Sequence, residues 1–185
     1  VAVILGYMGN TAVSASLLAS RWGKLVNNAC MSGMSAACGC TFGEVIQNEK
    51  ARACLSYLGR EVKYCCEAEG YILPTLAMGF SPTSLGIKDQ EQFNENQQMF
   101  IDMYSFAPGA KASMLQDLEK GKTTEVKMIN GYVSETGRKH GIPTPFNDTV
   151  IEVVKKIENK ELPLSMSNLD YFNDDWFTFD LYRAK

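Results

Sequence analysis

The amino-acid sequence predicts an all-helical domain. Apolar residues recur at three- and four-residue intervals in several segments, whereas few segments alternate between apolar and polar residues as a half-buried strand does. Glycine and proline interrupt the chain between these segments. The chain has 185 residues, which is enough for one domain with a sizeable core.

Three helices are predicted in the first part of the chain. The first spans residues 16–37 and ends at a glycine-rich break that begins at Gly39. The second ends near Gly70, a residue suited to the position after a helix. Asp89 and Gln92 have the spacing of a capping box, so they predict the start of a third helix. The apolar stripe of the helix that ends near Gly70 is predicted to consist of Leu55, Leu58, Val62 and Cys65.

Ser113, with Gln116 three residues later, predicts the cap of a short helix that Gly121 closes. The next helix is predicted over residues 124–140. Asn130-Gly131 is also a strong hairpin signal, so a hairpin over Met128–Val133 is the alternative. The longer apolar pattern favours the helix, in which Gly131 would allow close approach of another helix.

Thr144 and Pro145 are a suitable N-cap and first residue for a last helix. Its inward face is predicted to consist of Phe146, Val150, Val153, Val154 and Ile157. The helical domain is therefore expected to cover residues 1–165. Residues 166–185 carry many aromatic side chains among acidic ones, and we expect this tail to pack on the domain or on a partner chain.

Composition argues against two classes of protein. The net charge is −3 and no basic run occurs, which disfavours nucleic-acid binding. No apolar run approaches the ~20 residues that span a bilayer. The first residues lack the basic segment of a signal peptide, and the chain begins at Val1 without a methionine. We therefore expect a cytoplasmic protein and a piece of a longer chain.

The six cysteines include no C-x-x-C pair, and the one histidine, His140, lies far from them in sequence. Zinc sites normally have closely spaced ligand pairs. We therefore expect buried, reduced cysteines and no metal site. His140 is interpreted as a cation near a helix C-terminus.

A row of polar residues is the main functional signal. Lys24, Asn28 and Ser32 recur at four-residue intervals within an otherwise apolar helix, so they share one face. Such a row needs partners if it is buried, and a small polar substrate is one candidate. The alternatives are a surface lysine, a core amide, and a serine bonded to its own helix.

Several sequence words occur in the order and spacing of one known family. They are Trp22-Gly23-Lys24-Leu25-Val26-Asn27-Asn28, Ser113-Met114-Leu115-Gln116-Asp117, Thr124-Glu125, Asn130-Gly131 and His140-Gly141-Ile142-Pro143-Thr144-Pro145-Phe146-Asn147. Over residues 17–158 the chain closely resembles the C-terminal domain of ketopantoate reductase (2-dehydropantoate 2-reductase). The fold that this resemblance implies is shared with the C-terminal domain of 6-phosphogluconate dehydrogenase.

The resemblance implies a role for each matching residue. Lys24 would be the proton donor, and Asn28 would bind substrate. Ser113 would contact substrate or cofactor, and Glu125 would interact with both the lysine and the ligand. Where the family carries a second substrate-binding asparagine followed by proline, this chain has Ser32-Gly33, so the 2-keto acid it binds can differ.

The residue types suit ketone reduction even when the family resemblance is set aside. Hydride transfer to a ketone leaves a developing alkoxide, which a lysine ammonium can stabilise and protonate. Glu125 beside Lys24 would balance its charge, while Asn28 and Ser32 orient substrate oxygens. Ser113 and Glu125 also have structural alternatives, as a helix cap and as an acidic residue favoured by the helix dipole.

The chain lacks the G-x-G-x-x-G signature of a dinucleotide-binding domain. The resemblance implies that an N-terminal Rossmann domain precedes these residues in the parent protein, binds NADP and forms the cleft with them. It also implies a homodimer. The alternatives are a reductase of another 2-keto acid and a non-catalytic helical dimerisation module.

Overall fold

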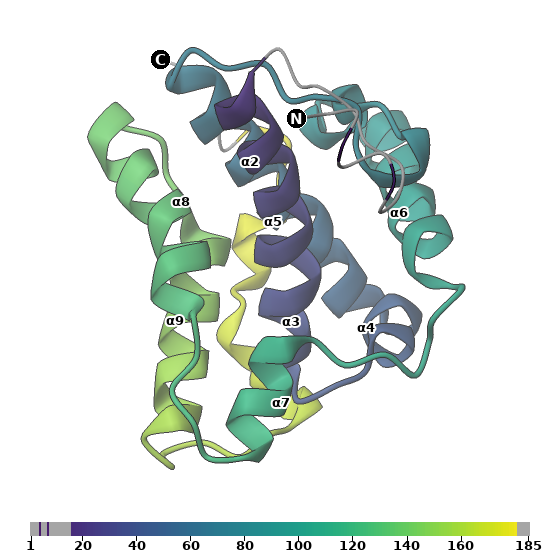
Figure 1. The fold of residues 1–185 in the computed structure, drawn as a ribbon. Coiled ribbons are helices and arrows are strands. Elements are labelled where there is room, and N and C mark those ends of the chain that lie inside the picture. Colours follow the sequence, from purple (N-terminus) through teal and green to yellow (C-terminus); the bar gives the residue numbers. More distant parts are fainter. Residues whose placement is uncertain (1–3, 5–6, 8–15, 181–185) are drawn as a thin grey trace.

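The computed structural model describes residues 4, 7 and 16–180, and helices are the only regular secondary structure in this part of the chain (Figure 1). The predicted fold class is thus confirmed. The first predicted helix is observed as three consecutive elements, α2 (Leu17–Asn27), the π-helical segment η1 (Asn28–Ser32) and α3 (Gly33–Cys38). The Ser16 side chain accepts a hydrogen bond from Ala19 N at 3.2 Å and caps α2.

A short helix that the sequence analysis missed follows the turn at Gly39. It is α4 (Phe42–Gln47), which begins with a capping box formed by Thr41 and Glu44. The region after Gly39 was expected to be only a break in the pattern. Thr41 and Glu44 have the three-residue spacing of a capping box, so the signal for this helix was present in the sequence.

Helix α5 (Glu49–Ala68) lies at the centre of the molecule and packs against α2, α4, α6, α8 and α9 (Figure 1). Its predicted apolar stripe is buried, and Gly70 follows its end with φ +81°. Arg60 and Glu61 near its middle are also fully buried. A charged side chain that is buried in a core needs hydrogen-bond partners there. Arg60 and Glu61 both have such partners.

The segment after α5 contains two short 3-10 helices, η2 (Ala77–Gly79) and η3 (Pro82–Gly86). Helix α6 (Gln90–Tyr104) begins as predicted, because the Asp89 side chain accepts from Gln92 N at 2.9 Å. The Gln92 side chain accepts from Lys88 N rather than from Asp89 N, so the capping box is incomplete.

Helix α7 (Ser113–Glu119) begins at Ser113, where a short helix was expected to open. Ala112 occupies the N-cap position, and Ser113 is the first helical residue. The prediction of a Ser113 cap was therefore wrong. The Gln116 side chain donates to the carbonyl of Lys111, which fixes the chain just before the helix.

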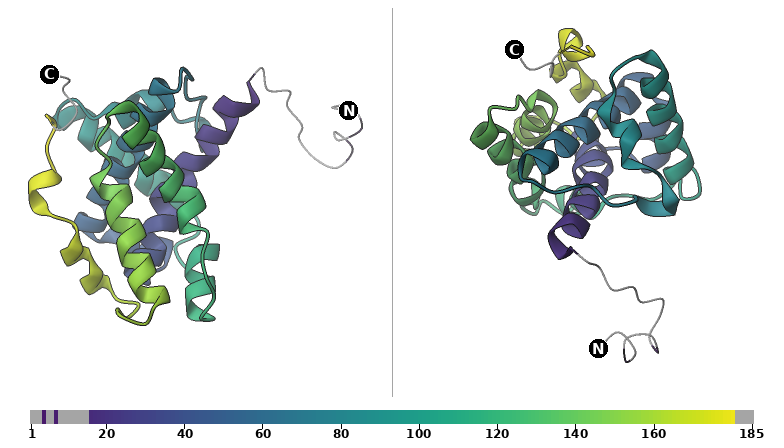
Figure 2. Two further views of the ribbon diagram at one scale, coloured as in Figure 1. Left: turned by 90° about the vertical axis from the view of Figure 1, so that its left-hand side faces the viewer. Right: turned by 90° about the horizontal axis from the view of Figure 1, so that it is seen from above.

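Helices α8 (Val126–His140) and α9 (Pro145–Glu158) form an antiparallel pair along one side of the molecule (Figures 1 and 2). Asn130 and Gly131 lie inside α8, so the helix is confirmed and the alternative hairpin is wrong. A Cβ atom on Gly131 would meet only ordinary contacts. Close approach depends instead on Gly33, where a Cβ atom would lie 3.1 Å from Asn130 Nδ2.

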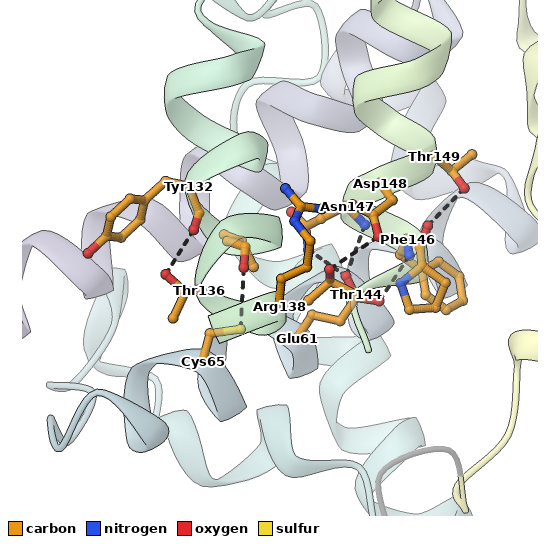
Figure 3. A network of polar contacts seen from close by, with 12 residues as sticks. Glu61, Cys65, Tyr132, Thr136, Arg138, Thr144, Phe146, Asn147, Asp148 and Thr149 are labelled. Atoms are coloured by element: carbon orange, nitrogen blue, oxygen red, sulfur yellow. Dashed lines mark hydrogen bonds and ion pairs between the residues drawn. The ribbon is translucent and has the colours of Figure 1, made fainter. Parts of the chain in front are cut away.

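The N-terminus of α9 is capped from another helix. Thr144 occupies the N-cap position, but its side chain caps nothing and donates to Asp148 instead. The buried Glu61 carboxylate of α5 accepts from Phe146 N and Asn147 N, both at 2.9 Å (Figure 3). It also accepts from Asn147 Nδ2 at 2.6 Å. These three hydrogen bonds join α5 and α9 in the core.

The aromatic segment contains η4 (Met166–Tyr171) and η5 (Asp174–Trp176) and packs on the core. Phe172 is fully buried, and the Phe177 ring lies 5.2 Å from that of Phe146. Arg60 Nη1 donates to the carbonyl of Thr178 at 3.0 Å, so a buried charge holds this segment. The end of the predicted tail, residues 181–185 with Tyr182, lies outside the described residues.

All six cysteines are buried free thiols. Burial raises their pKa, to about 12 for Cys65 and Cys66. Within the described residues, no cluster of three or more His, Cys, Asp and Glu is placed to hold a metal ion. His140 Nε2 lies 2.7 Å from Glu69 Oε1 at the end of α8. None of the helices in this part of the chain has the length and hydropathy to cross a bilayer.

We predict that Glu61→Ala destabilises the domain by about 3 kcal/mol, because three donors at the start of α9 lose their acceptor in the core. Urea unfolding followed by circular dichroism measures this loss. Glu135→Ala, at an exposed position of α8, is the control and should change stability by less than about 0.5 kcal/mol. Equal effects of the two substitutions would contradict the prediction.

Candidate functional site

The predicted polar row lies on α2 and η1. Lys24 is exposed, and Asn28 and Ser32 are half-buried. In an α-helix, each four-residue step drifts by about 40° around the axis, so Ser32 would lie about 80° from Lys24. A π-helical turn contains more than four residues, so a four-residue step falls short of a full turn. The side chain is therefore rotated about the axis in the opposite sense to the drift in an α-helix. The π segment Asn28–Ser32 therefore brings Ser32 back toward the face that carries Lys24.

A side chain from α8 supports this π turn. The Gly33 N–H donates to the carbonyls of Asn28 and Cys30. The carbonyl of Ala29, between them, accepts from Asn130 Nδ2 at 3.0 Å. The core amide that joins two helices is thus Asn130, the asparagine of the Asn-Gly word, and not Asn28.

Asn130 connects the π turn to the cap of α9. Its Nδ2 also donates to Asn147 Oδ1 at 2.9 Å, and Asn147 in turn donates to Glu61. All three side chains are fully buried. A continuous buried chain of hydrogen bonds therefore runs from the Glu61 carboxylate to the backbone of the candidate site.

Two other predicted site residues lie on elements that contact η1. Ser113 is the first residue of α7, and Glu125 occupies the N-cap position of α8. Both helices contact the π segment, so the elements that carry Ser113 and Glu125 meet the one that carries Asn28 and Ser32. Ser113 and Glu125 are exposed.

The position of Glu125 is fixed by its neighbour Thr124. The backbone N–H and the hydroxyl of Thr124 both donate to Glu158 Oε1, at 2.8 and 2.7 Å. Burial raises the pKa of the Glu158 carboxyl, but hydrogen bonds from Lys155 and Thr124 outweigh it, and the net shift is downward. Glu158 therefore stays ionised and anchors the start of α8 to the end of α9.

The five predicted side chains have no hydrogen bond or ion pair with one another or with other described residues. In particular, Lys24 and Glu125 form no ion pair in the part of the chain that the structure describes. The expected carboxylate beside Lys24 is thus not in contact with it. The polar groups of these side chains are therefore not used by other described residues. The five side chains are Lys24, Asn28, Ser32, Ser113 and Glu125.

Lys24 also lines a cavity of about 360 Å³ between α2, α6 and the segment before η2. Asn27 and Tyr104, which the sequence analysis did not assign to a site, line it too. The Tyr104 hydroxyl donates to Asn27 Oδ1, and burial raises the pKa of this phenol. Asn27 directly precedes Asn28, but no spacing rule pairs it with a tyrosine 77 residues away.

A second hollow of about 320 Å³ lies on the other side of α2, toward α8. Trp22 and Tyr132 line it, with ring centroids 5.3 Å apart, and so does the exposed Met128. The predicted polar row contributes no residue to its lining. The row thus lies between two hollows, of which only the first includes Lys24.

Comparison with known sequences shows which protein family this domain matches. Residues 16–158 match the family model described as Ketopantoate reductase PanE/ApbA C terminal. The chain is 32% identical over 142 residues to a 2-dehydropantoate 2-reductase of Archaeoglobus fulgidus, which covers 75% of this chain and 40% of that protein. It is 27% identical over 158 residues to the Salmonella typhimurium 2-dehydropantoate 2-reductase, with coverages of 85% and 45%.

Solved structures have the same fold. A PanE/ApbA family ketopantoate reductase from Ralstonia eutropha JMP134 superposes with a TM-score of 0.68 at 25% identity, over 86% of this chain and 48% of that one. D-mandelate dehydrogenase with NADH and anilino(oxo)acetate has a TM-score of 0.68 at 24% identity, over 86% and 59%. The chain belongs to the ketopantoate reductase family and corresponds to its C-terminal domain. It spans less than half the length of the two curated relatives described above.

We predict that Asn130→Ala destabilises the domain by about 1–3 kcal/mol, because the Ala29 carbonyl loses its donor in the core. The amide resonances of residues 28–33 should shift with it, since the π turn loses its support. Urea unfolding and a heteronuclear NMR spectrum measure the two effects. Asn94→Ala on the exposed face of α6 is the control. Unchanged amide resonances of residues 28–33 would contradict the prediction.

Proposed function

We propose that this chain is the substrate-binding and catalytic domain of an NADPH-dependent 2-dehydropantoate 2-reductase, which converts ketopantoate to pantoate for pantothenate and coenzyme A synthesis. The observation that carries the proposal is the unpartnered row of Lys24, Asn28 and Ser32, which runs from α2 into the π turn that both α7 and α8 contact. Membership of the ketopantoate reductase family supports the reaction class.

In this proposal, the Lys24 ammonium binds the keto oxygen and donates its proton to the alkoxide that forms there. Asn28 and Ser32, one and two turns further along, donate hydrogen bonds to the other oxygens of the substrate. Ser113 supplies a further hydroxyl from the start of α7. Glu125 provides a carboxylate from the start of α8, which contacts the π turn, and it balances the charge of Lys24 once substrate and cofactor are bound.

NADPH, when bound, supplies the hydride. Of the residues in this chain, Glu125 is the one we assign to cofactor binding, because it is exposed and has no partner among the described residues. The remaining contacts would come from an N-terminal Rossmann domain of the parent protein. We further propose a cytoplasmic homodimer, since one structural relative is named as a dimeric ketopantoate reductase.

A second candidate is a reductase of another 2-keto acid. Ser32 favours it, because a serine offers one donor where the family asparagine offers two. D-mandelate dehydrogenase, whose structure contains anilino(oxo)acetate, has the same fold. A panel of 2-keto acids offered to the full-length protein would separate the two candidates by their kcat/KM values.

We predict that Lys24→Ala in the full-length protein lowers kcat by about 10²- to 10⁴-fold, because the alkoxide loses its proton donor. The Kd for NADPH should change by less than about twofold, since in this proposal Lys24 contacts substrate and not cofactor. Steady-state kinetics and fluorescence titration measure the two quantities. Lys88→Ala, at an exposed position outside the site, is the control. Equal losses in both quantities would indicate a structural lysine.

We also predict that the 185-residue chain alone does not turn over. Mixed with NADPH and 2-dehydropantoate, it should leave the NADPH absorbance constant, because the hydride donor has no nucleotide-binding domain to hold it. The full-length protein at the same concentration is the positive control. Steady oxidation of NADPH by the isolated chain would refute the assignment of cofactor binding to a separate domain.

A further inference from the structure

We propose that the cavity beside Lys24 receives the organic group attached to the keto carbon of the substrate, and that Asn27 hydrogen-bonds an oxygen atom on that group. The proposal rests on the function proposed above, and it extends the site to residues outside the polar row. It assigns substrate selection to Asn27, Tyr104 and the apolar walls of the cavity.

The geometry of a 2-keto acid suits this arrangement. The carboxylate and the organic group are attached on opposite sides of the planar carbonyl. Lys24 belongs both to the polar row and to the cavity lining. With the keto oxygen at Lys24, a carboxylate directed along the row toward Asn28 leaves the organic group directed toward Asn27 and the cavity.

The cavity walls suit an apolar group. Leu76, Met99, Phe100 and Met103 line the cavity and are buried. A volume of about 360 Å³ lies within the range of small-molecule pockets, which are mostly apolar with a few polar groups. Methionine side chains adapt to different shapes, so these walls can accept branched groups.

Asn27 supplies a hydrogen-bonding group to the cavity lining. Its Oδ1 accepts from the buried Tyr104 hydroxyl, which fixes the orientation of the amide. The Tyr104 ring is held in turn by Phe42, with ring centroids 5.4 Å apart in an edge-to-face contact. The Asn27 Nδ2 group has no hydrogen bond to other described residues, so its N–H donors are available to an oxygen of the ligand.

Two substrates and three variants of the full-length protein test the proposal. The substrates are 2-dehydropantoate and 3,3-dimethyl-2-oxobutanoate, which differ only by the hydroxyl group, with pyruvate as a small reference. Thr75→Trp fills the cavity from an exposed lining position. Ile72→Trp is the matched control, because Ile72 is exposed in the same segment but does not line the cavity. Tyr104→Phe removes the anchor of Asn27.

We expect Thr75→Trp to lower kcat/KM for both branched substrates by about tenfold or more, and for pyruvate by less than about twofold. Ile72→Trp should leave all three values unchanged. Tyr104→Phe should lower kcat/KM by about three- to tenfold for 2-dehydropantoate and leave the value for its hydroxyl-free analogue unchanged.

Methyl NMR gives a readout that does not require turnover. Saturating 3,3-dimethyl-2-oxobutanoate should shift the methyl resonances of Met99 and Met103, and leave those of Met128 and Met166 in place. If the protein reduces 2-keto acids but Thr75→Trp does not discriminate by size and these two resonances do not move, the cavity assignment is overturned and the reductase remains. If no 2-keto acid is reduced, the proposed function fails. Unmoved Met99 and Met103 resonances would then overturn the cavity assignment as well.

Discussion

The buried Glu61 carboxylate is the constraint on which the rest of the fold depends. It lies at the N-terminus of α9, where unpaired N–H groups and the helix dipole stabilise a negative charge, and it accepts from Phe146 N and Asn147 N. Asn147 extends the network to Asn130, and Asn130 reaches the Ala29 carbonyl. One charge in the core thus sets the relative positions of α5, α8, α9 and the π turn.

The residues that support the backbone of the candidate site are different from the residues whose side chains are proposed to bind the ligand. The Nδ2 groups of Asn130 and Asn147 are buried and donate hydrogen bonds, although Asn130 Oδ1 has no partner among the described residues, whereas Lys24 is exposed. A buried polar network has few alternative arrangements, because each unpaired group in the core is costly. The π turn can therefore keep its side chains in register without using their own polar groups, which remain available for a ligand.

Local signals predicted most of the helices. The cap at Asp89, the turn at Gly70 and the inward face of α9 depend on neighbouring residues, so the sequence contains the necessary information. The cap of α7 is an exception. The spacing of Ser113 and Gln116 predicts a cap at Ser113, but Ala112 occupies the N-cap position and Ser113 is the first helical residue.

The sequence by itself determined the helical fold class, the family resemblance and the residues of the polar row, because these depend on spacing and residue type. Only the tertiary structure decided that Glu61 caps α9, that Asn130 supports the π turn, and that Tyr104 orients Asn27. Each of these contacts joins residues dozens of positions apart. Periodicity describes which face a residue occupies on its own helix, and contains nothing about which helix packs against that face.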